Sequence, residues 1–230
     1  MRRFDTDITM ILDRSGSMGS IAAETIDGFN RFLQEQRLLP GRACLTLVQF
    51  DDLYEVLYVG RDLNEVPNLD YDTFQPRGAT ALLDAIGMSI RMATSRLLVL
   101  PTTERPQQVI FVILTDGLEN ASGRFERRLV FDMIRHQRLT NQWNFLFMGA
   151  NQDAISEAGS LGIPENAAMT FESNARGTQD AFNKVSLSLR EMRLNSDDPI
   201  PWHDPSDWNA TTDPDSKHGR PRSTQPPRSE

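Results

Sequence analysis

The order of apolar segments along the chain is the sequence feature that most restricts its fold. Within the first 194 residues, short continuous apolar runs alternate with segments whose apolar residues recur at helical spacing. The runs predict strands at residues 8–12, 45–50, 54–59, 109–114, 145–148 and 169–171. Strands that alternate with helices are typical of a mostly parallel sheet with helices on both faces. The sequence therefore predicts an α/β fold with a doubly wound, six-stranded sheet.

One strand is predicted to run against the others. Only three residues separate the runs at 45–50 and 54–59, whereas a parallel crossover needs about a dozen. The third strand is therefore expected to be antiparallel, and one antiparallel edge strand fits this class of sheet. The strand order expected is 3-2-1-4-5-6, the usual order of a doubly wound sheet. Gly87 lies within the helix predicted around residues 82–97, and it indicates close packing of that helix on the sheet.

The composition changes near residue 194, which sets the expected domain boundary. Seven of the 13 prolines lie in the last 36 residues, where no helical or strand periodicity continues. We expect one domain over residues 1–194 and a flexible, disordered, Pro-rich tail over residues 195–230. The tail contains Trp202 and Trp208, which either rest on the domain surface or form a short docking motif.

Charge and cysteine content exclude several classes of protein. The chain has 24 basic and 32 acidic residues, and this net charge of −8 disfavours binding to nucleic acid or to an anionic membrane. Cys44 is the only cysteine, so it cannot form an internal disulfide, and it is expected to pack as a small hydrophobe. Asp5 and Asp7 interrupt any signal-peptide core, and no apolar run approaches the roughly 20 residues of a membrane span. We therefore expect a soluble cytoplasmic protein.

Oxygen-bearing side chains follow two of the predicted strands, and a third group begins a helix. The first strand ends in Asp-Arg-Ser-Gly-Ser (residues 13–17), and the fourth ends in Thr-Asp-Gly (residues 115–117). The helix after the third strand opens with Arg-Gly-Ala-Thr (residues 77–80). Ligands of open α/β sheets bind beyond the carboxyl ends of the strands, where the strand order reverses. In the expected order, the first two groups face one another there and the third joins them.

The donor atoms of these three segments are all oxygens. The candidate ligands are two carboxylates and three hydroxyls, from Asp13, Ser15, Ser17, Thr80 and Asp116. Oxygen ligands suit Mg²⁺, Mn²⁺ or Ca²⁺, and the absence of His and Cys from the set disfavours zinc. In an extended Asp-x-Ser-x-Ser segment, side chains two positions apart point the same way, so three ligands come from five residues. The sequence therefore predicts a site for a hard divalent cation.

This five-part pattern resembles the metal-ion-dependent adhesion site of von Willebrand factor A domains. All five positions match in spacing and order, and the resemblance extends over residues 4–193. Segments 47–51, 115–120 and 149–153 are also similar to those of small stand-alone bacterial members of this family. The resemblance implies neutral hydroxyl ligands and aspartates that bind partly through water, so that the cation keeps positive charge. It also implies an open coordination position, which a Glu or Asp of a partner protein fills.

The resemblance implies a function in protein binding, without catalysis by the chain itself. It implies Mg²⁺ or Mn²⁺, ahead of Ca²⁺, as the cation. It also implies a partner with an exposed Asp or Glu, such as an ATPase or a stress-response component. The residues expected to form the partner-binding rim, together with the segment 61–75, are Arg14, Met18, Arg77, Glu119, Asn120, Asn151 and Asp153.

Two other functions stay open on the sequence. A Mg²⁺-dependent phosphoester hydrolase would use the same oxygen-rich site, with Glu119 or Asp153 as its general base. A structural assembly factor would act through the tail tryptophans instead. The sequence contains no P-loop and no nucleophile elbow. His136 is expected to be a hydrogen-bonded structural residue beside an apolar helix face.

Overall fold

The strands predicted from the sequence form one mixed sheet. The computed structural model describes residues 5–150 and 154–194, and within them the sheet has the order β3-β2-β1-β4-β5-β6. The strands are β1 (Thr6–Asp13), β2 (Ala43–Phe50), β3 (Tyr54–Asp62), β4 (Gln108–Thr115), β5 (Asn144–Ala150) and β6 (Ala168–Phe171). The pair β2–β3 is antiparallel and the other pairs are parallel, so the predicted fold class is confirmed. The predicted tail, with Trp202 and Trp208, lies outside the described residues.

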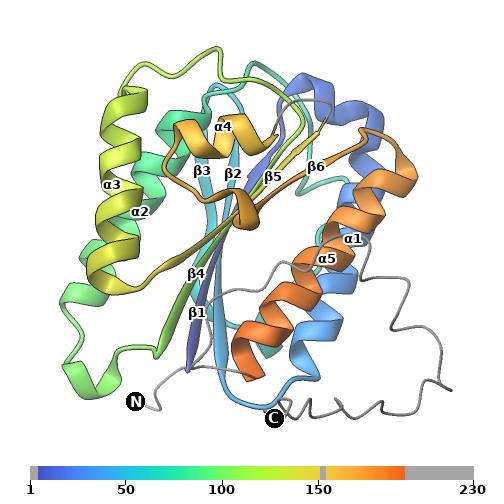
Figure 1. Cartoon of the computed structure of the whole chain (residues 1–230). Helices are drawn as coiled ribbons and strands as arrows, with labels where there is room; N and C mark the ends of the chain where they lie inside the picture. Colours follow the sequence, from blue (N-terminus) through green and yellow to red (C-terminus); the bar gives the residue numbers. More distant parts are fainter. Residues whose placement is uncertain (1–4, 151–153, 195–230) are drawn as a thin grey trace, which may run out of the picture. The chain divides into compact units, whose positions relative to one another are not determined.

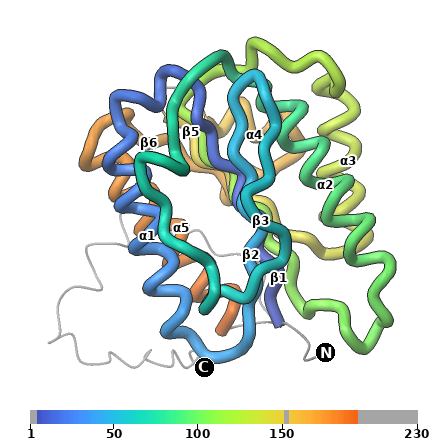
Figure 2. Tube along the Cα trace, turned by 180° about the vertical axis from the view of Figure 1, so that it is seen from behind, coloured from blue at the N-terminus to red at the C-terminus, as the bar shows by residue number. Residues whose placement is uncertain are grey.

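Helices cover both faces of the sheet. The α-helices are α1 (Ala22–Arg37), α2 (Leu82–Leu98), α3 (Arg127–Asn141), α4 (Ala154–Ser160) and α5 (Ala175–Leu194). The 3₁₀ helices are η1 (Gly16–Ile21), η2 (Leu63–Glu65), η3 (Thr102–Glu104) and η4 (Glu165–Ala167). Helices α1 and α5 lie side by side on one face, and α2 and α3 lie on the other (Figure 1 and Figure 2). Across the described ranges, no helix is both long and apolar enough to span a membrane.

The central strands are buried along almost their whole length. Every residue of β1 and β2 is buried, as is every residue of β4 after its first, because helices cover both faces of the sheet. The buried part of β1 also includes four polar residues, Thr6, Asp7, Thr9 and Asp13, and three of them lie outside the apolar run. The apolar run at 8–12 therefore predicted a shorter strand than the one that forms.

Two glycines allow close contacts between helices and their neighbours. A Cβ added at Gly28 of α1 would overlap the ring of Phe182 in α5. A Cβ added at Gly87 of α2 would overlap the ring of Phe125, which lies in the segment before α3. The close packing predicted at Gly87 is therefore present, but its partner is Phe125 and not the sheet.

A buried ion pair lies at the amino end of β1. The two terminal nitrogens of Arg96, in α2, each donate to one carboxylate oxygen of Asp7 at 2.7 Å. The thiol of Cys44 in β2 donates to Asp7 Oδ2 at 3.3 Å. Cys44 is buried, as predicted, and burial together with the nearby charge of Asp7 raises the pKa of its thiol. This cluster stabilises the end of the sheet opposite the predicted cation site.

Candidate metal centre

The five predicted ligands lie at the end of β1 and in three segments that meet at the carboxyl ends of β1 and β4. Asp13 ends β1, Ser15 precedes η1, and Ser17 is the second residue of η1. Asp116 follows β4 directly, and Thr80 lies two residues before the start of α2. Strands β1 and β4 are neighbours in the sheet, so these loops meet where the strand order reverses.

Hydrogen bonds connect four of the five residues. The Oγ atoms of Ser15 and Ser17 are 3.2 Å apart, and the Ser17 hydroxyl donates to Asp116 Oδ1 at 2.6 Å. Asp13 Oδ1 accepts a hydrogen bond from the backbone N–H of Ser15 at 2.6 Å. The loop after β1 is therefore folded back on its own aspartate and linked to the loop after β4.

Thr80 joins the same cluster because Gly117 has no side chain. A Cβ added at Gly117 would lie 3.0 Å from Thr80 Oγ1 and 3.8 Å from Ser17 Oγ. Any larger residue at this position would therefore fill the space between the hydroxyls. The structure brings all five predicted residues together, and glycine keeps the space among their oxygens open.

The two carboxylates of the cluster lie in an environment that disfavours their charge. Burial raises the pKa of Asp13 to about 6, against hydrogen bonds from Thr115 and Ser15, and the charge of Asp116 raises it further. The Thr115 hydroxyl donates to Asp13 Oδ2 at 2.5 Å, a contact that sequence reasoning missed. Burial also raises the pKa of Asp116, against the hydrogen bond from Ser17. A divalent cation would relieve this cost, because it stabilises both ionised carboxylates.

The donor set fits a hard divalent cation with one side turned to solvent. Asp13, Ser15 and Thr80 are buried, whereas Ser17 is exposed and Asp116 is half-buried. Within the described ranges, no group of three or more His, Cys, Asp and Glu side chains is placed to hold a metal. The hydroxyls therefore have to complete the ligand set, and an all-oxygen set suits Mg²⁺, Mn²⁺ or Ca²⁺.

The pH dependence of cation binding checks the environment of Asp13. A proton and a bound cation would compete for this carboxylate, whose pKa is about 6. We therefore expect an affinity that is level above that pH and falls about tenfold per pH unit below it. Calorimetric titration with Mn²⁺ across this range measures the effect. An affinity that stayed level well below pH 6 would contradict the assigned role of Asp13.

The metal-free protein is expected to respond to pH in the opposite direction. The pKa of Asp13 is higher in the folded chain than its ordinary value of 3.8, so the folded state binds the extra proton. The contribution of Asp13 to the free energy of unfolding therefore rises as the pH falls from about 7 toward 4. Denaturant unfolding of the wild type and Asp13→Asn over this range isolates the contribution, because the variant lacks the titrating group.

Two of the predicted rim residues are buried. Met18 is 0 % exposed, because η1 turns its side chain into the core, and the prediction that it lies on the rim is wrong. Arg14 is 5 % exposed, and its guanidinium pairs with Asp51 at 3.0 Å and with Glu55 at 2.6 Å. The Arg14 side chain is therefore buried beneath the loop after β1, where it pairs with acidic residues, and it is not available to a partner.

Glu119 and Asn120 fasten the loop after β4 to the start of α2. Glu119 Oε1 accepts from two backbone N–H groups of its own loop, at 3.0 and 2.7 Å. Its Oε2 accepts from the Leu83 N–H at 2.9 Å and from the Ser122 hydroxyl at 2.8 Å. Asn120 Oδ1 accepts from the Thr80 N–H at 2.9 Å, and the Asn120 N–H donates to the Thr80 carbonyl at 3.0 Å. These residues hold Thr80 in place, a role that their sequence positions did not reveal.

The other rim predictions differ in outcome. Arg77 is exposed beside the cluster, whereas Asn151 and Asp153 lie outside the described residues. Part of the segment 61–75 is fastened to α1, because the side chain of Asn30 exchanges hydrogen bonds of 2.9 and 2.8 Å with the backbone of Leu69. The backbone around Leu69 is therefore held against α1.

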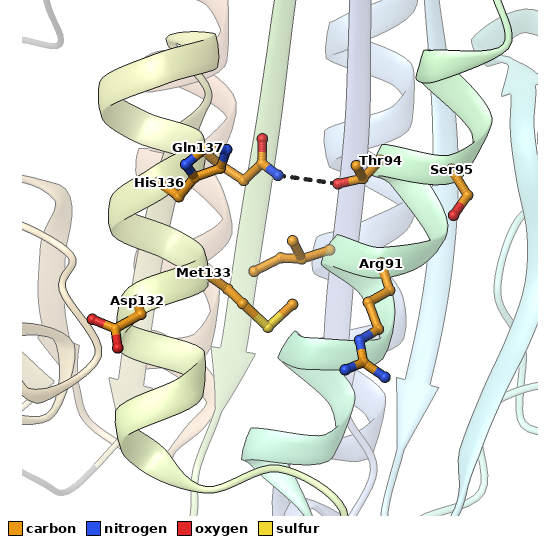
Figure 3. Close-up of a pocket in the computed structure, with 8 residues that line it drawn as sticks. Arg91, Thr94, Ser95, Asp132, Met133, His136 and Gln137 are labelled. Carbon is orange, nitrogen blue, oxygen red and sulfur yellow. Dashed lines mark hydrogen bonds between the residues drawn. The ribbon is translucent and has the colours of Figure 1, made fainter.

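A separate hollow lies between α2 and α3. Its volume is about 650 Å³, and Figure 3 shows Gln137 Nε2 donating to Thr94 Oγ1 across it at 3.1 Å. It is lined by Ile90, Arg91, Thr94, Ser95, Asp132, Met133, His136 and Gln137. These residues belong to the middle turns of the two helices, so the hollow is distinct from the oxygen cluster. His136 is exposed, and its Nδ1 lies 3.5 Å from Thr140 Oγ1 in the same helix.

Comparison with known proteins finds solved structures of similar fold. No protein-family model matches the sequence, and no curated protein matches it. Proximal thread matrix protein 1 from the mussel byssus is similar in structure, with a TM-score of 0.58 and 14% sequence identity. That match covers 81% of this chain and 48% of the mussel chain.

Two further structures share this fold. A von Willebrand factor type A structure from Catenulispora acidiphila has a TM-score of 0.50 and 15% identity, and the match covers 82% of this chain and 43% of that one. The mussel protein with a zinc-occupied metal-ion-dependent adhesion site has a TM-score of 0.57 and 17% identity, with 82% and 46% covered. This chain therefore spans less than half the length of each of these structures. At these identities the likeness establishes the von Willebrand factor A fold.

Proposed function

We propose that the chain is a metal-dependent protein-binding module. Five side chains would hold a divalent cation, and one coordination position would be left for a carboxylate of a partner protein. The observation that carries this proposal is the gathering of Asp13, Ser15, Ser17, Thr80 and Asp116 into one oxygen cluster. The cluster is open to solvent on the side of Ser17 and Asp116.

The chemistry of the donors supports both parts of the proposal. Three of the five ligands are neutral hydroxyls, so the only negative charge on the ligand set is that of two aspartates. A bound Mg²⁺ or Mn²⁺ supplies a positive centre that prefers an anionic oxygen ligand. The mussel structure with a zinc-occupied site of this type supports divalent cation binding at this place in the fold. The partner proposed here is a protein that presents an exposed Asp or Glu side chain.

The structure gives less support to a hydrolase. Of the two candidate general bases, Glu119 uses both of its carboxylate oxygens to accept hydrogen bonds from the surrounding loop and from α2. The other candidate, Asp153, lies outside the described residues. A general base has to reach the proton that it removes, and Glu119 is instead a structural clamp. We therefore assign no catalytic step to the chain.

A capture experiment tests the proposed function. The full chain is immobilised and exposed to lysate in Mg²⁺ and again in EDTA, beside Asp13→Ala and the control Asp132→Ala, which alters an exposed aspartate of α3 outside the predicted rim. We expect at least one protein that Mg²⁺ retains, that EDTA releases, and that the control variant still captures. Asp13→Ala should capture none of it. Equal capture of the same proteins in EDTA and by Asp13→Ala would contradict the proposal.

A further inference from the structure

Asp51, directly after β2, is a fully buried carboxylate beside the candidate metal centre, and it belongs to none of the five ligand positions. Its Oδ2 accepts hydrogen bonds from Arg14 Nε at 3.0 Å and from Arg77 Nε at 2.9 Å. Its Oδ1 accepts from the backbone N–H of Leu53 at 2.6 Å. One buried side chain therefore holds an arginine from the loop after β1 and an arginine from the loop before α2.

These two loops carry three of the five oxygen ligands. Backbone hydrogen bonds also join them, because the Gly16 N–H donates to the Gly78 carbonyl at 3.2 Å and the Arg77 N–H donates to the Arg14 carbonyl at 2.8 Å. Gly16 lies between Ser15 and Ser17, so the contact with Gly78 is made within the cation-binding turn itself. The two loops are thus joined by two backbone hydrogen bonds, and the side chains of Arg14 and Arg77 both bind the carboxylate of Asp51.

The backbone of Asp51 adds a third connection. Its carbonyl accepts from the N–H of Ala81, the residue that follows Thr80, at 2.9 Å. Burial opposes the charge of the Asp51 carboxylate, but hydrogen bonds from Leu53 and Arg77 and the charges of Arg77 and Arg14 hold its pKa below the ordinary value. The residue is therefore ionised at neutral pH and keeps both arginines in place.

We propose that Asp51 is a positioning residue that fixes the distance between the Ser15–Ser17 turn and Thr80, and thereby determines how tightly the centre binds a cation. The inference rests on the proposed function and adds a residue to it that touches neither the cation nor the partner. Outer groups that orient ligands commonly change metal affinity by about 10–100-fold when they are replaced. Because Asp51 acts through backbone segments, we expect the lower end of that range.

The test compares two buried aspartates that each pair with arginine. Asp51→Asn removes the charge that holds the two loops, whereas Asp7→Asn breaks the pair with Arg96 at the opposite end of β1. Calorimetric titration of the full chain with Mn²⁺ should show about tenfold weaker binding for Asp51→Asn. Asp7→Asn should lower the free energy of unfolding and leave the Mn²⁺ affinity within about twofold of the wild type.

Hydrogen exchange in the metal-free protein gives a second readout. We expect Asp51→Asn to speed amide exchange at Gly16, Arg77 and Ala81, the donors of the three bonds that join the loops. In Asp7→Asn, exchange at these three amides should rise by no more than its loss of global stability explains. The milder variant Arg77→Ala removes the ion pair between Arg77 and Asp51 and keeps the buried ion pair between Arg14 and Asp51. It should therefore weaken Mn²⁺ binding less than Asp51→Asn does.

The outcomes separate this inference from the proposed function. Wild-type affinity and wild-type exchange in Asp51→Asn would overturn the role of Asp51 and leave the metal centre standing. Equal losses of affinity in Asp51→Asn and Asp7→Asn would also overturn it, because the effect would then follow from stability alone. A wild-type chain that bound no Mn²⁺ would overturn both. Weaker binding with faster exchange, confined to Asp51→Asn and Arg77→Ala, supports it.

Discussion

Asp13→Ala is expected to weaken Mg²⁺ and Mn²⁺ binding by about 100-fold or more, because it removes one of only two carboxylates in the ligand set. The metal-free variant should be at least as stable as the wild type. Burial raises the pKa of Asp13 to about 6, which means that the folded chain holds this charge at a cost. Calorimetric titration measures the affinity, and thermal unfolding without a cation measures the stability.

Thermal unfolding with added Mg²⁺ distinguishes loss of binding from loss of folding. A cation that binds only the folded chain raises the unfolding temperature by mass action, so the wild type should gain stability and Asp13→Ala should not. The control Asp132→Ala, at an exposed aspartate of α3, should respond to Mg²⁺ as the wild type does. A Mg²⁺-dependent gain in Asp13→Ala equal to that of the wild type would show that the cation binds elsewhere.

Arg96→Met is expected to cost the largest amount of stability, about 3–5 kcal/mol. The side chain of Asp7 is only 2 % exposed, and Arg96 satisfies both of its carboxylate oxygens. Loss of the guanidinium would leave a buried charge whose remaining partner in the cluster is the weak donor Cys44. Urea unfolding monitored by circular dichroism measures the loss, with the midpoint falling at an unchanged slope.

Two further variants show whether the ion pair is the cause. Arg42→Met breaks the ion pair between Arg42 and Asp62. Their side chains are 39% and 24% exposed, so the variant should lose about 1 kcal/mol of stability or less. In Asp7→Asn/Arg96→Met both charges are gone, and the double variant should be more stable than Arg96→Met alone. A double variant less stable than Arg96→Met would mean that the unpaired charge of Asp7 is not the cause of the loss.

The fold and the cluster of oxygens were predictable because their signals are local. Strand runs and helical spacing predicted the fold class, and the strand order usual for that class placed Asp13, Thr80 and Asp116 at one edge of the sheet. Each candidate ligand sits at the end of an element, where a short segment of sequence carries the whole pattern. The metal assignment itself stays a prediction until a cation is measured.

The supports around the cluster were not predictable, because their partners are distant in sequence. Asp51 lies 37 positions from Arg14 and 26 from Arg77, and nothing in the order of residues indicates that they meet. Glu119 was predicted to be a rim carboxylate, yet its oxygens accept hydrogen bonds from the loop after β4 and from the start of α2. Met18 follows the motif directly, but the turn of η1 buries it. Such roles depend on side-chain direction, which spacing alone does not give.

The central claim is that the oxygen cluster binds one divalent cation and leaves it a position for a carboxylate. The most direct measurement is solvent proton relaxation of the full chain loaded with Mn²⁺, followed by titration with acetate. The account predicts enhanced relaxation, from a protein-bound Mn²⁺ that still carries exchangeable water, and a decline as acetate displaces that water. Asp13→Ala should show neither effect. A wild-type chain that gave no enhancement, or an enhancement that acetate left unchanged while Asp13→Ala retained it, would contradict the account.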